Sequence, residues 1–508
     1  MRKYIKYEER MTIMKRSKSP SFVLTLKLNT NKADDRILNH RFWCAQQIHN
    51  ALVRYCIKQI TKLRSDKLYR ELLDSYIKDK KAGRRDERIV KALNETRMVY
   101  GLSEFSLQSY ATVLQKRYKR DIDSGAAQKI ATAVWESASS VLFGKGKRMH
   151  FKSFHDIDSI EGKSNNSGIR YINGRLEWNK KKIPVQHDKK DVYEELALQH
   201  RVKYCRIKRK VVGTKYHFYL ELILEGFPPA KHVMNEGRTG IDIGTSTVAT
   251  YSDDGACILD ELASGIEDID KKKRALNRKM DRSRRAINPQ NYNEDGTVKK
   301  GRKKWKLSNT YCKDRMKYKE LCRKRAAAVK QSHETLANKI LEHGTTVIVE
   351  KMSFAGLAKK VKKTERNKKG KFKKKKRFGK SIQSRAPAML ISIIDRKLHY
   401  IGKEIIKVNT KKFRASQYNH VTDTYNKKKL SHRYAVIDGK RIQRDLYSAF
   451  LIMNSDDTYL RTDRQKCIAT YQQFCLMHDK CIRDLINSNK KYPSSMGLKY
   501  FVTCQCGA

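Results

Sequence analysis

The chain has 508 residues, and its 113 Lys and Arg against 53 Asp and Glu give a formal net charge of +60. A charge of this size favours a polyanionic partner, nucleic acid first, and argues against an ordinary soluble metabolic enzyme, whose copies would repel one another. The 39% of hydrophobic residues exclude disorder along the whole chain, and the 7 prolines exclude a Pro-rich architecture.

The sequence indicates a cytoplasmic protein. We find no run of about 18 apolar residues and no apolar segment behind the basic N-terminus, so we expect neither a transmembrane helix nor secretion. The 11 cysteines are odd in number and follow no framework spacing, which predicts reduced thiols. Cys504 and Cys506 come nearest to a zinc-binding pair, but a zinc ribbon needs two close pairs.

The first half of the chain contains a strand, a helical stretch and a β-rich segment. Residues 21–28 alternate apolar and polar side chains, as a strand does. Helical spacing of apolar residues begins at about Asp35 and continues, with interruptions, to about Phe143. Short β-rich runs with turn signals fill residues 150–226, which favours a small antiparallel barrel or sandwich. Residues 229–238 are expected to be a linker.

From Gly240 onward the pattern is that of an α/β domain. The expected elements are, in order, strands at 240–244 and 247–251, a tight turn at 253–255, a basic helical region at about 267–342, a strand at 346–350, a basic low-complexity stretch, a helix at about 384–402, a strand at 404–408, a helix that begins near 444, and an amphipathic helix at 463–487.

Three acidic residues lie where an unpaired charge is costly. Asp242 interrupts an apolar strand, Glu350 ends another, and Asp445 opens a helix with an apolar face. If the two strands are neighbours in one sheet, the three carboxylates can meet at its edge, where their hard oxygen donors suit Mg²⁺. Two such ions about 4 Å apart would activate a water and stabilise the leaving oxygen of a phosphodiester.

Each acid also has an interpretation without chemistry, and singly these interpretations are favoured. Asp242, shortly before Gly244, would be a turn residue. Glu350 would be an edge-strand charge paired with Lys351. Asp445 would be a helix N-cap. The set is more specific than its members, because two acids mark strands of the same design and the third marks the start of a helix.

Three segments resemble the RuvC nuclease motifs of the TnpB family and of its relatives, the type V CRISPR effectors. They are, in order, GIDIGTSTVAT at 240–250, VIVEKMSF at 347–354 with a basic insert after it, and RDLYSA at 444–449. The order Asp, Glu, Asp matches that family, whereas integrase-like transposases end their triad in Glu. The resemblance covers about residues 20–452, and the three motifs are its specific part.

The resemblance implies a mixed α/β fold with an RNase H-like RuvC nuclease domain, a helical recognition lobe and a small β-barrel wedge domain. The implied parts are, in chain order, 1–30 (first part of the wedge), 31–149 (recognition lobe), 150–236 (wedge), 237–415 (RuvC motifs I and II with inserts), 416–443 (target-nucleic-acid-binding remnant), 444–454 (RuvC motif III) and 455–508 (helical extension).

The function implied by the resemblance is that of an RNA-guided DNA endonuclease. Guide RNA and target double-stranded DNA would be the partners, with no membrane involved, and cleavage would occur next to a short flanking motif. Asp242, Glu350 and Asp445 would bind Mg²⁺, two ions in all, and carry out the cleavage. The expected location is the cytoplasm of a prokaryotic cell, on the nucleoid when DNA is bound.

Two alternative functions stay open, as does the origin of the chain. One is an RNA-guided DNA-binding protein without cleavage. The other is a guide-free, transposon-associated DNA-processing protein. A CRISPR locus, a transposon and a lineage between them are all compatible with the sequence.

The sequence departs from the family between residues 417 and 444. TnpB proteins usually carry two cysteine pairs there, and this interval has none. His420 and His432 alone would be a weak metal site, and we expect both to be polar surface residues. We therefore predict a remnant of the target-binding module and no structural zinc.

Two basic runs hold much of the charge. On a helix, Arg274, Arg278, Arg282 and Arg285 fall at i, i+4, i+8 and i+11, which is one face, and we expect this stripe to contact nucleic acid phosphates. A solvated charged face is the alternative. The second run, 359–380, lacks periodicity, which favours salt-sensitive non-specific binding, or disorder without a ligand.

Overall fold

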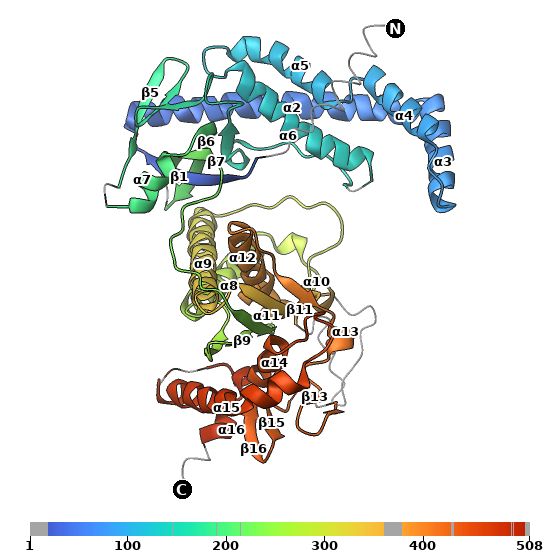
Figure 1. The fold of residues 1–508 in the computed structure, drawn as a ribbon. Coiled ribbons are helices and arrows are strands. Elements are labelled where there is room, and N and C mark those ends of the chain that lie inside the picture. The colour runs from blue at the N-terminus through green and yellow to red at the C-terminus, as the bar shows by residue number, and fades with distance from the viewer. Residues whose placement is uncertain are drawn as a thin grey trace. The chain divides into compact units, whose positions relative to one another are not determined.

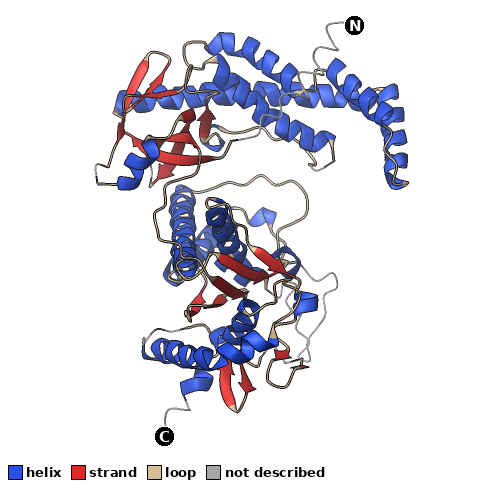
Figure 2. Ribbon diagram, in the orientation of Figure 1, coloured by secondary structure: helices blue, strands red, loops and turns tan. Residues whose placement is uncertain are grey.

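The computed structural model describes residues 19–144, 146–188, 190–213, 215–359, 378–427, 431–488, 490 and 492–502. Most of the second basic run, and Cys504 and Cys506, lie outside these residues. The chain divides into two compact units, Met1–Pro229 and Ala230–Ala508, with the boundary in the predicted linker. Both units mix helices and sheet (Figures 1 and 2). No helix in the described ranges is long and apolar enough to cross a membrane.

The helices of the N-terminal unit confirm the predicted helical stretch. They are α2 (Lys32–Ser65), α3 (Lys67–Lys81), α4 (Glu87–Val99), α5 (Glu104–Gln115), the short 3₁₀ helix η1 (Lys116–Tyr118) and α6 (Ser124–Leu142). Each α-helix begins after a side chain that accepts a hydrogen bond from its first turn. Asn31 caps α2 and Asp123 caps α6. The buried side of α2, including Leu38 and Phe42, packs into the core of this unit.

The sheet of the N-terminal unit is antiparallel, with strand order β2-β6-β7-β1-β5-β4-β3. Its elements are β1 (Ser21–Leu28), β2 (Ser159–Glu161), β3 (Arg170–Ile172), β4 (Arg175–Trp178), β5 (Lys181–Gln186), β6 (Val202–Val212) and β7 (Lys215–Glu225), with η2 (Phe154–Asp156) and α7 (Val192–Leu198) between them. Among the described residues, the end strands β2 and β3 do not pair with each other, so backbone hydrogen bonds do not close the sheet into a barrel. Asn165 connects the end strand β3 to β6, the neighbour of the other end strand, because its backbone N–H donates to the Lys203 carbonyl of β6 and its side chain bonds the backbone of Tyr171 in β3.

The C-terminal unit is built on a five-stranded sheet of order β10-β9-β8-β11-β12, in which β8, β11 and β12 are parallel. Its strands are β8 (Arg238–Ile243), β9 (Thr247–Ser252), β10 (Cys257–Glu261), β11 (Thr346–Glu350) and β12 (Ile406–Val408). Its helices are α8 (Glu267–Ile287), α9 (Asn309–Leu341), α10 (Phe354–Leu357), α11 (Gly379–Arg385), α12 (Pro387–His399), α13 (Thr410–Phe413), α14 (Arg444–Met453), α15 (Arg464–Asn487) and α16 (Lys499–Val502), with 3₁₀ turns η3 (Pro289–Asn291) and η4 (Ser494–Met496). Two small hairpins precede α14: β13 (Tyr418–Asn419) with β14 (Thr424–Tyr425), and β15 (Tyr434–Ile437) with β16 (Lys440–Gln443).

The predicted helical region at 267–342 is not continuous. Residues 288–308 separate α8 from α9, and Pro289 follows the end of α8. The buried side chain of Asn288 donates to the backbone oxygens of Arg284 and Lys306, so it ties the end of α8 to the far end of the connection. This break was not predicted, because the turn residues at 288–308 lie within a basic composition that is typical of helix.

The two faces of the C-terminal sheet are covered by different helices. Ile241 and Val349 pack with α9 and α12 in one apolar cluster, whereas Ile348 packs with α14 and α15 in another. Figure 1 shows α14 below the sheet and α9 and α12 above it. Because strand side chains alternate between faces, Asp242 and Glu350 belong to the face that α14 covers.

Gly240 allows α14 to approach this face closely. A Cβ at Gly240 would lie 2.2 Å from the Ala449 carbonyl oxygen and 2.4 Å from the Met453 backbone nitrogen. Both atoms are helix backbone, so no side-chain rotation can relieve the contact. The absence of a side chain at Gly240 therefore lets the second half of α14 pack directly against β8.

We expect Gly240→Val to lower the free energy of unfolding of the C-terminal unit by about 3 kcal/mol, because α14 must move away from β8. Denaturant unfolding measures this change. The matched control is Gly356→Ala, at an exposed glycine where the nearest atoms belong to the Ser353 side chain. Equal stability of the two variants would contradict close packing of α14 on β8.

Candidate active site

Asp242 and Glu350 occupy equivalent positions on neighbouring parallel strands. Ile241 of β8 and Val349 of β11 are register partners, and the two acids are the next residues on their strands. Both strands run in the same direction, so the acids lie side by side and on the same face. This confirms that the two strands are neighbours in one sheet. Both carboxylates are half-buried beneath α14.

Asp445 is brought to this face by the first turn of α14. The Gln443 side chain caps the helix by accepting a hydrogen bond from the Leu446 N–H at 2.7 Å. The Gln443 side-chain amide also donates to Asp445 Oδ2 at 3.4 Å. The Arg444 guanidinium donates to Asp445 Oδ1 at 3.1 Å, in an ion pair that is mostly buried. The Gln443 and Arg444 side chains thus orient both oxygens of Asp445.

The electrostatics show that Asp242 lies within the influence of the other two acids. Burial, followed by the charges of Asp445 and Glu350, raises the pKa of Asp242 well above the ordinary Asp value. The charge of Arg444 and the nearby Ser448 side chain act in the opposite direction. Burial also raises the pKa of Glu350, and the Ala415 backbone N–H, which bonds this carboxylate, partly offsets that effect. A cation placed among the acids would relieve this cost of keeping them ionised.

The donor chemistry of the three acids fits Mg²⁺. All three offer carboxylate oxygens, which are the ligands that hard divalent cations prefer. The three carboxylates do not form a closed ligand set: among the described residues, the one group of three such side chains with ligand atoms within 4.8 Å of one another lies in the N-terminal unit. The three acids therefore lie on one face of the sheet without converging on one point, and Asp445 is held in its ion pair with Arg444.

The structure overturns the three interpretations without chemistry. Asp242 lies within β8 rather than in a turn. Glu350 ends β11, which is an interior strand between β8 and β12 and not an edge. The N-cap of α14 is Gln443, so Asp445 is free of that role. None of the three acids therefore has the structural role that these interpretations gave it.

The module at 416–443 contains a core that the sequence did not indicate. His420, expected on the surface, is 1% exposed, whereas His432 is exposed as expected. The His420 ring packs edge-on against Tyr471 at 4.7 Å between centroids, and its Nδ1 shares a hydrogen bond with the Tyr447 hydroxyl at 2.7 Å. The expectation for His420 was wrong because α15 supplies aromatic partners that lie far away in the sequence.

Burial and the nearby charge of Arg464 lower the pKa of His420 to about 4. The unfolded value is near 6.5, so this contribution to stability is complete above pH 6.5 and is lost as the pH falls toward 4. We expect the free energy of unfolding of the wild type to fall over this range by about 3 kcal/mol more than that of His420→Asn, which keeps an acceptor for Tyr447. Urea unfolding at several pH values measures the difference. Parallel pH profiles would contradict the buried neutral histidine.

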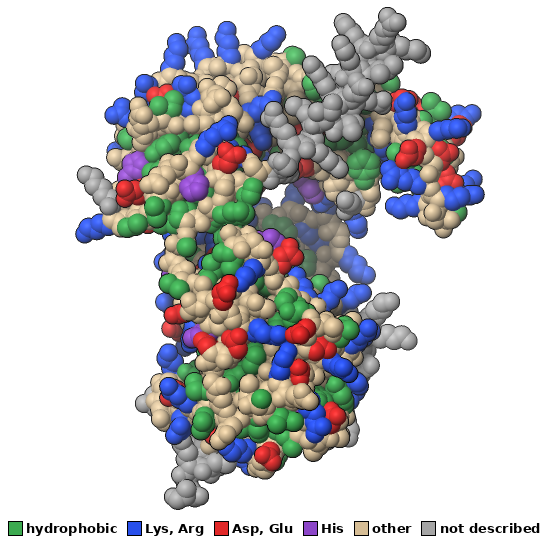
Figure 3. All heavy atoms as spheres, in the orientation of Figure 1, with side chains coloured by type: hydrophobic (Ala, Val, Ile, Leu, Met, Phe, Trp, Pro, Cys, Tyr) green, Lys and Arg blue, Asp and Glu red, His purple; other side chains and the backbone are tan. Residues whose placement is uncertain are grey.

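The arginine stripe on α8 is exposed, but its members differ. Arg285 pairs with Asp281 at 2.9 Å and donates to the Gly296 carbonyl oxygen, so it is held within the α8–α9 connection. Arg274, Arg278 and Arg282 are exposed and make no ion pair or hydrogen bond with other described residues. These three guanidinium groups are therefore available to a partner. Figure 3 shows Lys and Arg side chains spread over the visible faces of both units.

No protein-family model matches the chain, and no curated protein matches it. Among solved structures, it is similar to a Cas12f1–sgRNA–target DNA complex, with 13% identity, a TM-score of 0.42, and coverage of 86% of this chain and 99% of that chain. A CRISPR-Cas12f ternary complex gives 14% identity, a TM-score of 0.23, and coverage of 81% and 80%. A Cas12i1 R-loop complex before target DNA cleavage gives 12% identity, a TM-score of 0.26, and coverage of 89% and 64%. TM-scores below 0.5 do not establish a shared fold.

The sequence did not indicate the residues that support the acids. Gln443 caps α14, Arg444 pairs with Asp445, and Ser448 lies near enough to Asp242 to favour its ionised form. The C-terminal extension contributes as well, because His478 of α15 accepts a hydrogen bond from the Gln443 backbone N–H at 2.9 Å and the Met496 carbonyl accepts one from its side chain at 3.2 Å. Of these residues, only Arg444 and Ser448 lie in a segment that the sequence pattern indicated, RDLYSA at 444–449.

Proposed function

We propose that the chain is an RNA-guided DNA endonuclease of the TnpB and type V kind, with a RuvC-type site formed by Asp242, Glu350 and Asp445. One observation carries the proposal. Two acids at equivalent positions of neighbouring parallel strands face the helix whose first turn bears the third. The charges of Asp445 and Glu350 both raise the pKa of Asp242, which supports a common environment for the three acids. The sequence order Asp, Glu, Asp supports the same assignment.

In this proposal the carboxylates of Asp242, Glu350 and Asp445 would hold Mg²⁺, which would supply an activated water and stabilisation of the leaving oxygen of the phosphodiester. The protein's own part is to orient oxygens. Gln443 and Arg444 hold Asp445, whereas the nearby Ala415 N–H and Ser448 side chain favour the ionised forms of Glu350 and Asp242. Arg444 also supplies a positive charge beside the acids, where an anionic strand would enter.

The proposed partners are a guide RNA and a target double-stranded DNA. The net charge of +60 and the exposed arginines of α8, Arg274, Arg278 and Arg282, support a polyanionic partner. Guide pairing would read most of the target sequence, and the protein would read a short flanking duplex. We assign the helical stretch to guide and heteroduplex binding, and the sheet that β1 forms with β5 and β7 to a wedge domain split along the sequence.

Sequencing of RNA that co-purifies with the full-length protein tests the proposal. We expect one defined RNA species with a constant scaffold and a variable segment. Cleavage of DNA that matches the variable segment, in Mg²⁺, would support the nuclease. Guided binding without cleavage would favour the RNA-guided binding protein. Tight DNA binding that survives RNase treatment, with no defined RNA, would favour the guide-free DNA-processing protein and overturn the proposal.

A further inference from the structure

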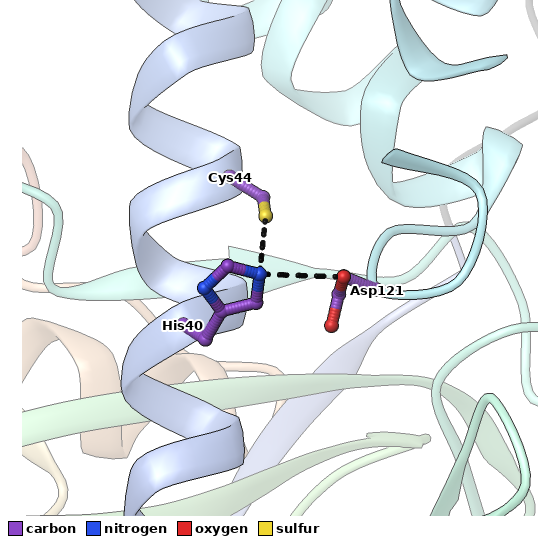
Figure 4. A group of neighbouring side chains, drawn as sticks. All are labelled: His40, Cys44 and Asp121. Carbon is purple, nitrogen blue, oxygen red and sulfur yellow. Dashed lines mark hydrogen bonds and ion pairs between the residues drawn. The ribbon is translucent and has the colours of Figure 1, made fainter. Parts of the chain in front are cut away.

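A second group of ligand-type side chains lies in the N-terminal unit, in a region with no part in the proposed nuclease chemistry. His40 and Cys44 are one turn apart on α2, and Asp121 comes from the turn after η1. Figure 4 shows one ring nitrogen of His40 between the Cys44 sulfur and an Asp121 oxygen, with a dashed line to each. The three ligand atoms, His40 Nε2, Cys44 Sγ and one Asp121 oxygen, all lie within 4.8 Å of one another.

The distances match the edges of a tetrahedral zinc site. His40 Nε2 lies 3.6 Å from Cys44 Sγ and 3.5 Å from Asp121 Oδ2. Zn–N, Zn–S and Zn–O bonds of about 2.0–2.3 Å at tetrahedral angles place nitrogen about 3.6 Å from sulfur and about 3.3–3.5 Å from oxygen. Both distances from His40 Nε2 therefore fit a tetrahedral site, and the third distance, from Cys44 Sγ to the Asp121 oxygen, is within 4.8 Å.

The side chains are held in place by their surroundings. The His40 ring stacks on Trp43, with centroids 5.5 Å apart, and Trp43 contacts Tyr118 of η1 edge-on. The Tyr118 carbonyl oxygen accepts a hydrogen bond from the Asp121 backbone N–H at 2.9 Å. One chain of contacts thus fixes both the helix-borne ligand and the turn-borne ligand, as a preorganised site requires.

Exposure differs across the group in a way that suits a bound ion. Cys44 is fully buried, whereas the His40 side chain is 55% exposed and that of Asp121 is 27% exposed. An ion could enter from the solvent side and keep a water there. Zinc would bind Cys44 as the thiolate, and its two positive charges would offset the charges of that thiolate and of Asp121.

We propose that His40, Cys44 and Asp121 form a Zn²⁺ site with water as the fourth ligand. The site ties the first third of α2 to the turn that leads into α6, and so braces the helical part of the N-terminal unit. It departs from the sequence-based expectation that the protein has no structural zinc. The proposal does not depend on the nuclease assignment, since none of its residues takes part in that site.

Metal binding to the full-length protein, freed of bound nucleic acid, tests the proposal. Zinc content is measured after dialysis, and Co²⁺ replaces zinc as a spectroscopic probe of thiolate ligation. The wild type is expected to hold one equivalent more zinc than Cys44→Ser or Asp121→Asn and to show a thiolate-to-cobalt charge-transfer band that Cys44→Ser lacks. Zinc is also expected to raise the melting temperature of the wild type but not of Asp121→Asn.

Two control variants keep the test decisive. Cys56→Ser removes another fully buried thiol of α2 and is expected to keep both the zinc and the cobalt band. His40→Ala changes an exposed side chain, so it should fold normally and yet lose the metal. Equal zinc content in the wild type, Cys44→Ser and His40→Ala would overturn the proposal and leave the three residues as a hydrogen-bonded group only.

Discussion

Asp242→Asn is expected to lower DNA cleavage by about a thousandfold or more and to leave guided DNA binding unchanged. Metal ions supply several kcal/mol of transition-state stabilisation, and each 1.4 kcal/mol corresponds to about a factor of ten in rate. Asp242 is the acid beneath α14 whose pKa responds to both other acids, so its loss removes a ligand from the centre of the proposed site. Cleavage and binding of one matched DNA, measured separately, give the two quantities.

A matched control and a stability measurement separate loss of chemistry from loss of structure. Asp260→Asn changes a half-buried acid of β10 in the same sheet and should cleave normally. The raised pKa of Asp242 means that its contribution to stability is present below the ordinary Asp pKa and is lost as the pH rises through the folded value. Asp242→Asn should therefore melt no lower than the metal-free wild type at neutral pH. Normal cleavage by this variant would refute the site assignment.

Replacing Arg274, Arg278 and Arg282 together with glutamine is expected to weaken nucleic acid binding roughly a hundredfold near 0.1 M salt. Each cation removed from a phosphate reduces the slope of log affinity against log salt by about 0.9, so the slope should fall by about 2–3. The three side chains are exposed and make no ion pair with other described residues, so their replacement should not destabilise α8. Titrations at several salt concentrations give both values.

The triple lysine variant of the same positions is the control for this experiment. Lysine keeps the charge, and phosphate attraction depends chiefly on charge, so affinity and salt slope should stay close to those of the wild type. Arg285→Gln should have a smaller effect, because Arg285 is already paired with Asp281. An unchanged slope in the glutamine variant would show that the stripe is a solvated face.

Local patterns were enough to predict the strands and the first two acids. The alternation at 21–28 reappears as β1, and the apolar run at 346–350 as β11. An acid within such a run is conspicuous because its burial is costly, so Asp242 and Glu350 could be selected from their apolar neighbours in the sequence. Their meeting followed once the strands paired in parallel and in register, which the sequence could only suggest.

The supporting contacts could not be predicted, because they join segments far apart along the chain. Gln443 meets His478 across 35 residues, and His420 meets Tyr471 through the packing of α15. The sequence around Gly240 carries no sign that α14 packs against this residue. Neither helical periodicity nor strand alternation carries information on such partners. The same holds for Asp121, which approaches His40 only through the return of the chain after η1.

The most direct test of the account is cleavage reprogrammed by exchange of the RNA. The purified protein is loaded with its co-purifying RNA, or with the same RNA carrying a new variable segment, and given two DNA duplexes that share the flanking sequence. We predict that each RNA directs Mg²⁺-dependent cleavage of its own matching duplex, and that EDTA or Asp242→Asn abolishes both. Cleavage that ignores the RNA sequence, or that persists in Asp242→Asn, would contradict the account.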